Sequence, residues 1–225
     1  MCNVSVNTWV KRYKSDGISV LLTKSGCGRK SIIEEEDKDK DAIFTAIKEL
    51  EELSLSETID LYYGDETHVC SEGYAPYGWQ FPDEEVCILS EKAYKVNCFG
   101  FISRQNQCHW QMTTENIDTQ FVLEYLEQFS FEIRKITFIV LNNARIHKAK
   151  AILERIPFWQ KRGLYIVYLP PYCPHLNIAE TFWRKLKKEW INQEDYIEKD
   201  MLFYAVNRCL ANVGETWILI SLILI

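Results

Sequence analysis

The chain has 225 residues, 47% of them hydrophobic, which is enough to bury the core of one medium domain with a small appendage. Its formal net charge is −6, yet residues 1–33 carry six basic side chains against one acidic one, which suits contact with a polyanion such as DNA or an ordinary solvated basic face. The eight cysteines are scattered without a C-x-x-C pair, and no apolar signal segment precedes them, which argues against a disulfide framework, a zinc site and export.

The first 56 residues are predicted to form two parts, a basic DNA-binding piece at residues 1–33 and a charged linker with a helix at residues 34–56. A short helix is expected over residues 7–14 of the basic piece. In the second part, the charged run 34–41 is expected to be solvated. The helix is predicted over Ala42–Leu53, where apolar residues recur at helical spacing.

Strand and helix signals alternate along residues 57–215. Strands are predicted at residues 58–63, 87–89, 95–102, 108–112, 135–141 and 164–169. Helices are predicted at residues 119–129, 147–159, 178–190 and 201–213. A run of strands followed by a β-α-β-α order favours one α/β domain, a mixed sheet flanked by helices.

The last segment, residues 216–225, is nearly all apolar. From Trp217 onward it has nine residues, whereas a membrane-spanning helix needs about 20, so no contact with a membrane is expected. A buried strand and an exposed, aggregation-prone tail both fit this composition.

Three polar residues stand at the ends of predicted elements far apart in the sequence. Asp65 follows the first predicted strand, Asn142 follows a continuous apolar strand, and Glu180 lies in the first turn of a later helix. Functional groups in an open α/β sheet collect at the carboxyl ends of the strands, so the three are expected to converge on one edge. Each also has a simpler interpretation. Asp65 suits a turn, Asn142 suits a hydrogen bond to loop backbone, and Glu180 suits a capping box with Asn177.

The sequence around these residues forms a specific signature when its blocks are taken together. The blocks are Gly64-Asp-Glu66, residues 73–79, Asn143-Ala-Arg-Ile-His147, Leu169-Pro-Pro-Tyr172, and Leu176-Asn177 with Glu180 and Trp183. They resemble the DDE-superfamily transposases of the mariner and insertion-sequence type. The resemblance implies an RNase H-like fold and two-metal phosphoryl transfer on DNA. It also implies that Asp65, Asn142 and Glu180 are the catalytic residues and the ligands of two Mg²⁺ or Mn²⁺ ions.

This chain departs from the family at Asn142, where the family carries aspartate. The middle carboxylate of such a site usually bridges both ions. An asparagine offers one neutral oxygen and an NH₂ group that repels a cation. We therefore predict weaker metal binding and little strand cleavage.

Further residues are assigned by their place in the same pattern. Near-site roles are expected for Glu66, Asn143, His147 and Asn177, with His147 either packing at the start of a helix or reaching a phosphate. Contacts with DNA, or a merely solvated surface, are expected for Lys11, Arg12, Arg29, Lys30, Arg184 and Lys187. The segments Trp9–Arg12 and Gly28–Lys30 resemble the end of the family's helix-turn-helix region, so the chain looks like a truncated copy.

Three functions are compatible with these observations. The first is a transposase that cuts and joins double-stranded DNA at element ends and in target DNA, impaired here by Asn142. The second is a catalytically inactive DNA-binding protein derived from a transposase. The third is an RNase H-like nuclease that works with one strong metal site. The family further implies a homodimer, in the cytoplasm or nucleoid of a bacterium or the nucleus of a eukaryote.

Overall fold

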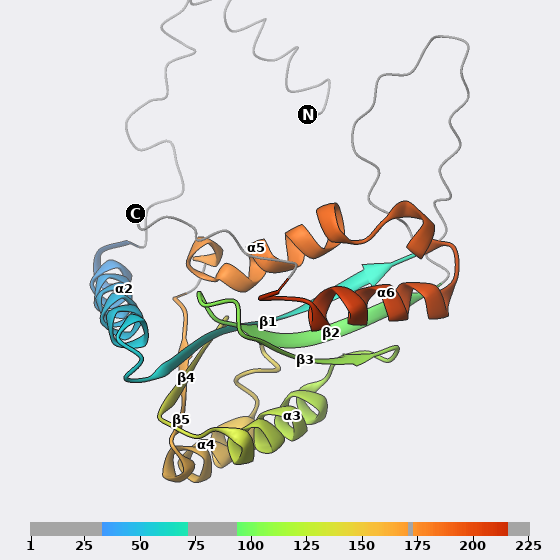
Figure 1. The fold of residues 1–225 in the computed structure, drawn as a ribbon. Helices are drawn as coiled ribbons and strands as arrows, with labels where there is room; N and C mark the ends of the chain where they lie inside the picture. The colour runs from blue at the N-terminus through green and yellow to red at the C-terminus, as the bar shows by residue number, and fades with distance from the viewer. Residues whose placement is uncertain (1–32, 72–93, 171–172, 216–225) are drawn as a thin grey trace, which may run out of the picture. The chain divides into compact units, whose positions relative to one another are not determined.

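A five-stranded mixed sheet forms the centre of the part of the chain that the structure, a computed structural model, describes: residues 33–71, 94–170 and 173–215 (Figure 1). The strands are β1 (Asp60–Cys70), β2 (Lys95–Ile102), β3 (Cys108–Thr113), β4 (Thr137–Leu141) and β5 (Leu164–Tyr168), in the order β3-β2-β1-β4-β5. β1 pairs antiparallel with β2 and parallel with β4, and β4 pairs parallel with β5. The predicted mixed sheet is therefore confirmed. The helix expected at residues 7–14, the strand at 87–89 and the apolar tail lie outside the described residues.

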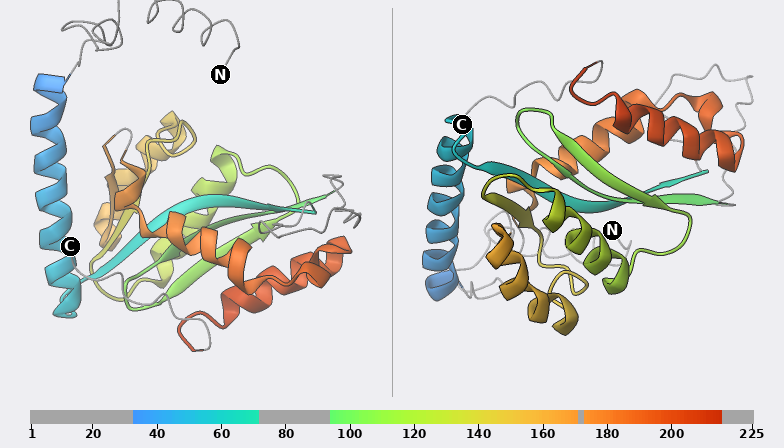
Figure 2. Two further views of the ribbon diagram at one scale, coloured as in Figure 1. Left: turned by 90° about the horizontal axis from the view of Figure 1, so that it is seen from above. Right: turned by 60° about the horizontal axis from the view of Figure 1, so that its bottom comes forward.

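Helices cover both faces of the sheet. α3 (Thr119–Glu132) and α4 (Lys150–Arg162) lie on one face, and α5 (Ile178–Lys185) and α6 (Lys199–Ala211) lie on the other, as the views of Figure 2 also show. Alternate residues of β1 face the two layers, since Tyr62 belongs to the buried cluster formed with α3 and α4, whereas Leu61 and Tyr63 belong to the cluster that includes α5 and α6. No helix among the described residues is long and apolar enough to cross a membrane.

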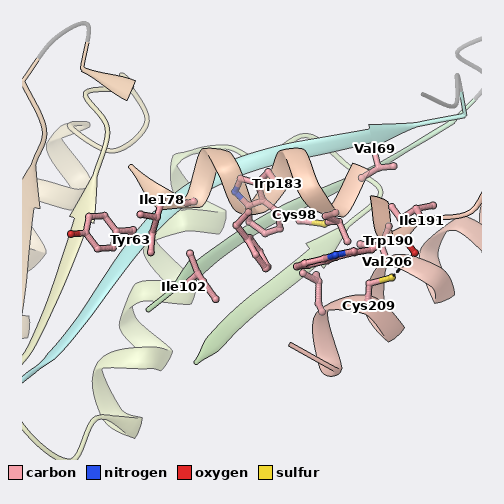
Figure 3. Close-up of a cluster of buried hydrophobic side chains, with 14 of the residues drawn as sticks. Tyr63, Val69, Cys98, Ile102, Ile178, Trp183, Trp190, Ile191, Val206 and Cys209 are labelled. Atoms are coloured by element: carbon pink, nitrogen blue, oxygen red, sulfur yellow. Dashed lines mark hydrogen bonds between the residues drawn. The ribbon is translucent and has the colours of Figure 1, made fainter. Parts of the chain in front are cut away.

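The layer that contains α5 is held by large buried side chains (Figure 3). Trp183 of α5 lies over Gly100 of β2, where a Cβ atom would stand 3.3 Å from the indole ring. A π-helical turn, η3 (Leu186–Trp190), continues α5, and the Cys209 thiol of α6 donates to the Trp190 carbonyl at 3.4 Å. These contacts fix α5, and with it the first turn that carries Glu180, against the sheet.

Two helices begin three or more residues away from their predicted starts. α2 spans Ile33–Leu55, so it begins nine residues before the predicted start at Ala42 and includes the charged run. That run places acidic residues four positions before lysines, a spacing that supports a helix. The chain divides into two units, residues 1–41 and 42–225, and the candidate site lies in the second. α4 begins at Lys150 rather than His147, because residues 145–148 form a turn.

Candidate active site

Asp65 lies within β1, at the point where its parallel neighbour ends. Gly64 pairs with Leu141, the last residue of β4, whereas Asp65 pairs only with Gly100 of β2. The prediction that the strand ends at residue 63 is therefore wrong. β1 continues to Cys70 because β2 supplies an antiparallel partner for its polar second half. Asp65 is 8% exposed, so its carboxyl group is largely buried beside the end of β4.

Asn142 directly follows β4 and meets Asp65. Its Nδ2 donates to Asp65 Oδ1 at 2.8 Å, and its Oδ1 accepts from the backbone N–H of Ala144 at 3.0 Å. A backbone N–H can only donate, so the oxygen of the amide must face Ala144 and the NH₂ group must face Asp65. The structure thus brings together two of the three predicted residues, and Asn142 also makes the loop hydrogen bond that its simpler interpretation predicts.

His147 is fully buried in the turn before α4 and contacts both Asn142 and Glu66. Its Nδ1 lies 2.9 Å from Asn142 Oδ1, and its Nε2 lies 3.1 Å from Glu66 Oε2. Because Asn142 Oδ1 is an acceptor, Nδ1 carries the hydrogen in this contact. The Tyr168 hydroxyl donates to the His147 carbonyl at 2.7 Å and holds the turn against β5. His147 therefore packs inside the site instead of opening a helix.

Asn177 ties the helix that carries Glu180 to the strand that carries Asp65. Its Oδ1 caps α5 by accepting from the N–H of Ala179 at 3.1 Å, and its Nδ2 donates to the Gly64 carbonyl at 3.0 Å. The side chain is buried, so both bonds are protected from water. Glu180 lies exposed in the first turn, as predicted, with its charge acting on Asp65.

The side-chain amide of Asn143 joins the segments that follow β4 and β5. Asn143 Nδ2 donates to the Leu169 carbonyl, and the Leu169 N–H donates to the Leu141 carbonyl at 2.9 Å. The loop after β4 is thereby fastened to the segment that follows β5. The sequence did not reveal Tyr168 or the Gly64 carbonyl as parts of the site. A signal for Gly64 existed, because a glycine inside a strand marks close packing, and a Cβ here would stand 2.6 Å from Leu141.

The carboxyl groups of the site have opposite pKa shifts. Burial, and then the charges of Glu66 and Glu180, raise the pKa of Asp65 to about 7, against the lowering effects of the Glu66 backbone N–H and of His147. Burial also acts to raise the pKa of Glu66, but the contact and charge of His147, together with hydrogen bonds from the Glu66 backbone and from Asp65, outweigh it and leave that pKa below its usual range. Glu66 thus stays ionised beside His147, while Asp65 is only partly ionised near neutral pH.

Asp65, Glu66 and Glu180 offer the hard oxygen ligands that Mg²⁺ and Mn²⁺ prefer. Within the described ranges, no three side chains of His, Cys, Asp or Glu are grouped closely enough to hold an ion. Of the residues predicted to bind DNA, Arg184 and Lys187 lie on α5 and η3, with Arg184 exposed and Lys187 half-buried. The others, Lys11, Arg12, Arg29 and Lys30, lie outside the described residues.

Comparison with known proteins identifies the family. Residues 60–202 match the family described as DDE superfamily endonuclease. The crystal structure of the catalytic domain of Mos1 mariner transposase has a TM-score of 0.51 and 11% identity, over 80% of this chain and 83% of that chain. The Mos1 transposase paired-end complex with left transposon end has a TM-score of 0.51 and 13% identity, over 94% and 68%. The mariner Mos1 paired end complex with Mg has a TM-score of 0.50 and 13% identity, over 94% and 72%.

No curated protein matches the chain. At 11 to 13% identity, the likeness to solved structures establishes the fold, an RNase H-like sheet flanked by helices. The family match spans most of the chain, from the first residue of β1 into α6, and includes Asp65, Asn142 and Glu180. The chain therefore belongs to the DDE superfamily endonuclease family.

Proposed function

We propose that this chain is a DDE-type transposase domain, which cuts and joins DNA at element ends, and that Asn142 impairs this copy. The observation that carries the proposal is the meeting of Asp65 and Asn142 at 2.8 Å, with Glu180 near enough for its charge to act on Asp65. Family membership supports it. Because Mos1 structures hold a transposon end and Mg, double-stranded DNA ends and Mg²⁺ or Mn²⁺ are the proposed partner and ions.

The donor set does not fit a two-ion site as it stands. Two-metal phosphoryl transfer places one ion on the attacking oxygen and one on the leaving oxygen, and both need anionic ligands. Asp65 and Glu180 supply two carboxylates. Asn142 supplies an oxygen already held by Ala144 and an NH₂ group that faces Asp65. The formal charge of the three residues falls from −3 to −2, against +4 for two divalent ions. We therefore expect weak ion binding and little cleavage.

The test is nicking of supercoiled DNA in Mg²⁺ or Mn²⁺ by the natural protein and by Asn142→Asp. We expect nicking by Asn142→Asp alone, and its loss when Glu180→Gln is added to that variant. Equal nicking by the natural protein would refute the impairment. Strand transfer of a labelled DNA end into a plasmid then separates a transposase from a simple nuclease.

The second candidate is a catalytically inactive DNA-binding protein. The observation that favours it is the hydrogen bond from the Asn142 NH₂ group to Asp65, which already engages the carboxylate. On this alternative, folded Asn142→Asp does not nick DNA, whereas the natural protein binds DNA with an affinity that falls as salt rises. Replacing Arg184 and Lys187 with glutamine should flatten that salt dependence if α5 meets the DNA backbone. The basic segment of residues 1–33 is part of both proposals, as a DNA-binding segment that precedes the catalytic domain in the sequence.

A further inference from the structure

Every polar atom of the Asn142 side chain is committed to a partner. Its Oδ1 receives the N–H of Ala144 at 3.0 Å and faces His147 Nδ1 at 2.9 Å, and its Nδ2 donates to Asp65 at 2.8 Å. The two groups that face Oδ1 act as donors, so they fix the rotation of the amide. His147 is fully buried and Asp65 is nearly so. The NH₂ group is therefore held against Asp65 and is not free to turn away.

Two of these three contacts would serve an aspartate equally well. A carboxylate oxygen accepts from the Ala144 N–H and from His147 Nδ1 as readily as an amide oxygen does. Only the third contact needs asparagine. With aspartate at residue 142, an oxygen would replace the NH₂ group, and two carboxylate oxygens would face each other at about 2.8 Å. Such a pair is stable only with a proton or a cation between its oxygens.

We infer that the Asn142 amide takes the place of a bridging cation, so that in this chain Asp65 of β1 and the residue that follows β4 are joined by an N–H···O hydrogen bond and the site is closed without metal. This inference rests on the proposed function, since it assumes that residue 142 stands at the metal-binding position of a DDE site. The surrounding donors remain those that an aspartate would use. The site is therefore expected to change from metal-independent to metal-dependent through one substitution.

The experiment is thermal unfolding in EDTA and in millimolar MgCl₂ at about pH 8.5, where a proton shared by the two carboxyl groups is held less tightly than at neutral pH. Three proteins are compared: the natural chain, Asn142→Asp, and the exchange variant Asp65→Asn with Asn142→Asp. We expect the natural Tm to be the same in both buffers. In EDTA, Asn142→Asp should unfold about 5 °C lower, because a hydrogen bond to a charged group is replaced by repulsion, and MgCl₂ should restore most of the loss.

The exchange variant isolates the hydrogen bond from the chemistry of each residue. Its amide at residue 65 donates to the carboxylate at residue 142, so we expect a near-natural Tm in EDTA and no response to MgCl₂. Three results would overturn the inference: a natural protein that MgCl₂ stabilises as much as it does Asn142→Asp, an Asn142→Asp protein that MgCl₂ does not stabilise, or an exchange variant as unstable in EDTA as Asn142→Asp. Nicking by the natural protein would instead refute the proposed impairment, and the two failures are thus distinguishable.

Discussion

Replacing Asp65 with asparagine is expected to stabilise the protein at about pH 8 and to change little at about pH 4. Burial, followed by the charges of Glu66 and Glu180, raises the pKa of this carboxyl group from 3.8 to about 7. A group whose pKa is raised on folding contributes its full stability below the unfolded pKa and loses it as the pH rises through the folded pKa. An asparagine at residue 65 stays neutral and avoids this loss.

The size of the effect follows from the two pKa values. A rise from 3.8 to about 7 corresponds to at most about 4 kcal/mol above pH 7. The hydrogen bond from Asn142 favours the ionised carboxylate, so we expect a smaller gain, about 1 to 3 kcal/mol in the free energy of unfolding. The same amide also donates readily to an asparagine oxygen, so the contact between β1 and β4 survives the substitution.

Urea unfolding of both proteins between about pH 4 and about pH 8 measures this difference. The expected result is a gain for Asp65→Asn that grows across this range and levels off above about pH 7. Asp200→Asn, which changes an exposed carboxylate of α6, is the matched control and should stay within about 0.5 kcal/mol of the natural protein. An Asp65→Asn protein that is no more stable at pH 8, or equally stabilised at both ends of the range, would refute the electrostatic reasoning.

Three further substitutions test the supports of the site and the contact between α3 and α4. Glu127→Gln should lower the free energy of unfolding by about 1 to 3 kcal/mol at neutral pH, because the arginines that surround Glu127 lower its pKa to about 2 against the effect of burial. This loss should vanish as the pH falls from 4.5 to about 2. An equal loss in urea unfolding at neutral pH and near pH 2 would contradict this. Asn177→Ala removes a helix cap and the hydrogen bond to the Gly64 carbonyl, and should lower the free energy of unfolding by about 2 to 4 kcal/mol. Asn177→Asp keeps the cap and should lose less stability; two equally unstable variants would argue against the cap. Gly64→Ala should lower the free energy of unfolding by about 2 kcal/mol or more, because the new Cβ would stand 2.6 Å from Leu141. A urea midpoint equal to that of the natural protein would show instead that the neighbouring side chains move aside.

The layers of the fold could be predicted where apolar periodicity is strong. α3 follows the pattern closely, since Val122, Tyr125, Leu126 and Phe129 are buried as their helical spacing predicts. The apolar run before Asn142 likewise forms the inner strand β4. In both elements most buried positions are apolar, with Ser130 of α3 and Thr137 of β4 as exceptions, so the local sequence and the tertiary packing favour the same structure.

The course of β1 could not be predicted, because its second half is polar. Residues Asp65 to His68 interrupt the apolar run, and only the pairing with β2 keeps them in a strand. The turn around His147 was missed for a similar reason. Its sequence suits a helix, but the contacts of the imidazole with Asn142 and Glu66 hold it in a turn. Local preference gives way in both places where side chains distant in the sequence meet, and both places border the candidate site.

Two hydrogen bonds that support the candidate site do not depend on the chemistry of residue 142. Asn177 joins α5 to the Gly64 carbonyl, and Asn143 joins the loop after β4 to Leu169, each through a neutral amide. Neither bond requires an ion or a charge at residue 65, 142 or 180. An aspartate and an asparagine at residue 142 therefore leave these two bonds, which hold the elements that carry Asp65 and Glu180, equally intact. Because these two bonds remain, a single Asn142→Asp substitution in the presence of Mg²⁺, with no second change to rebuild the scaffold, tests whether the site can cut DNA.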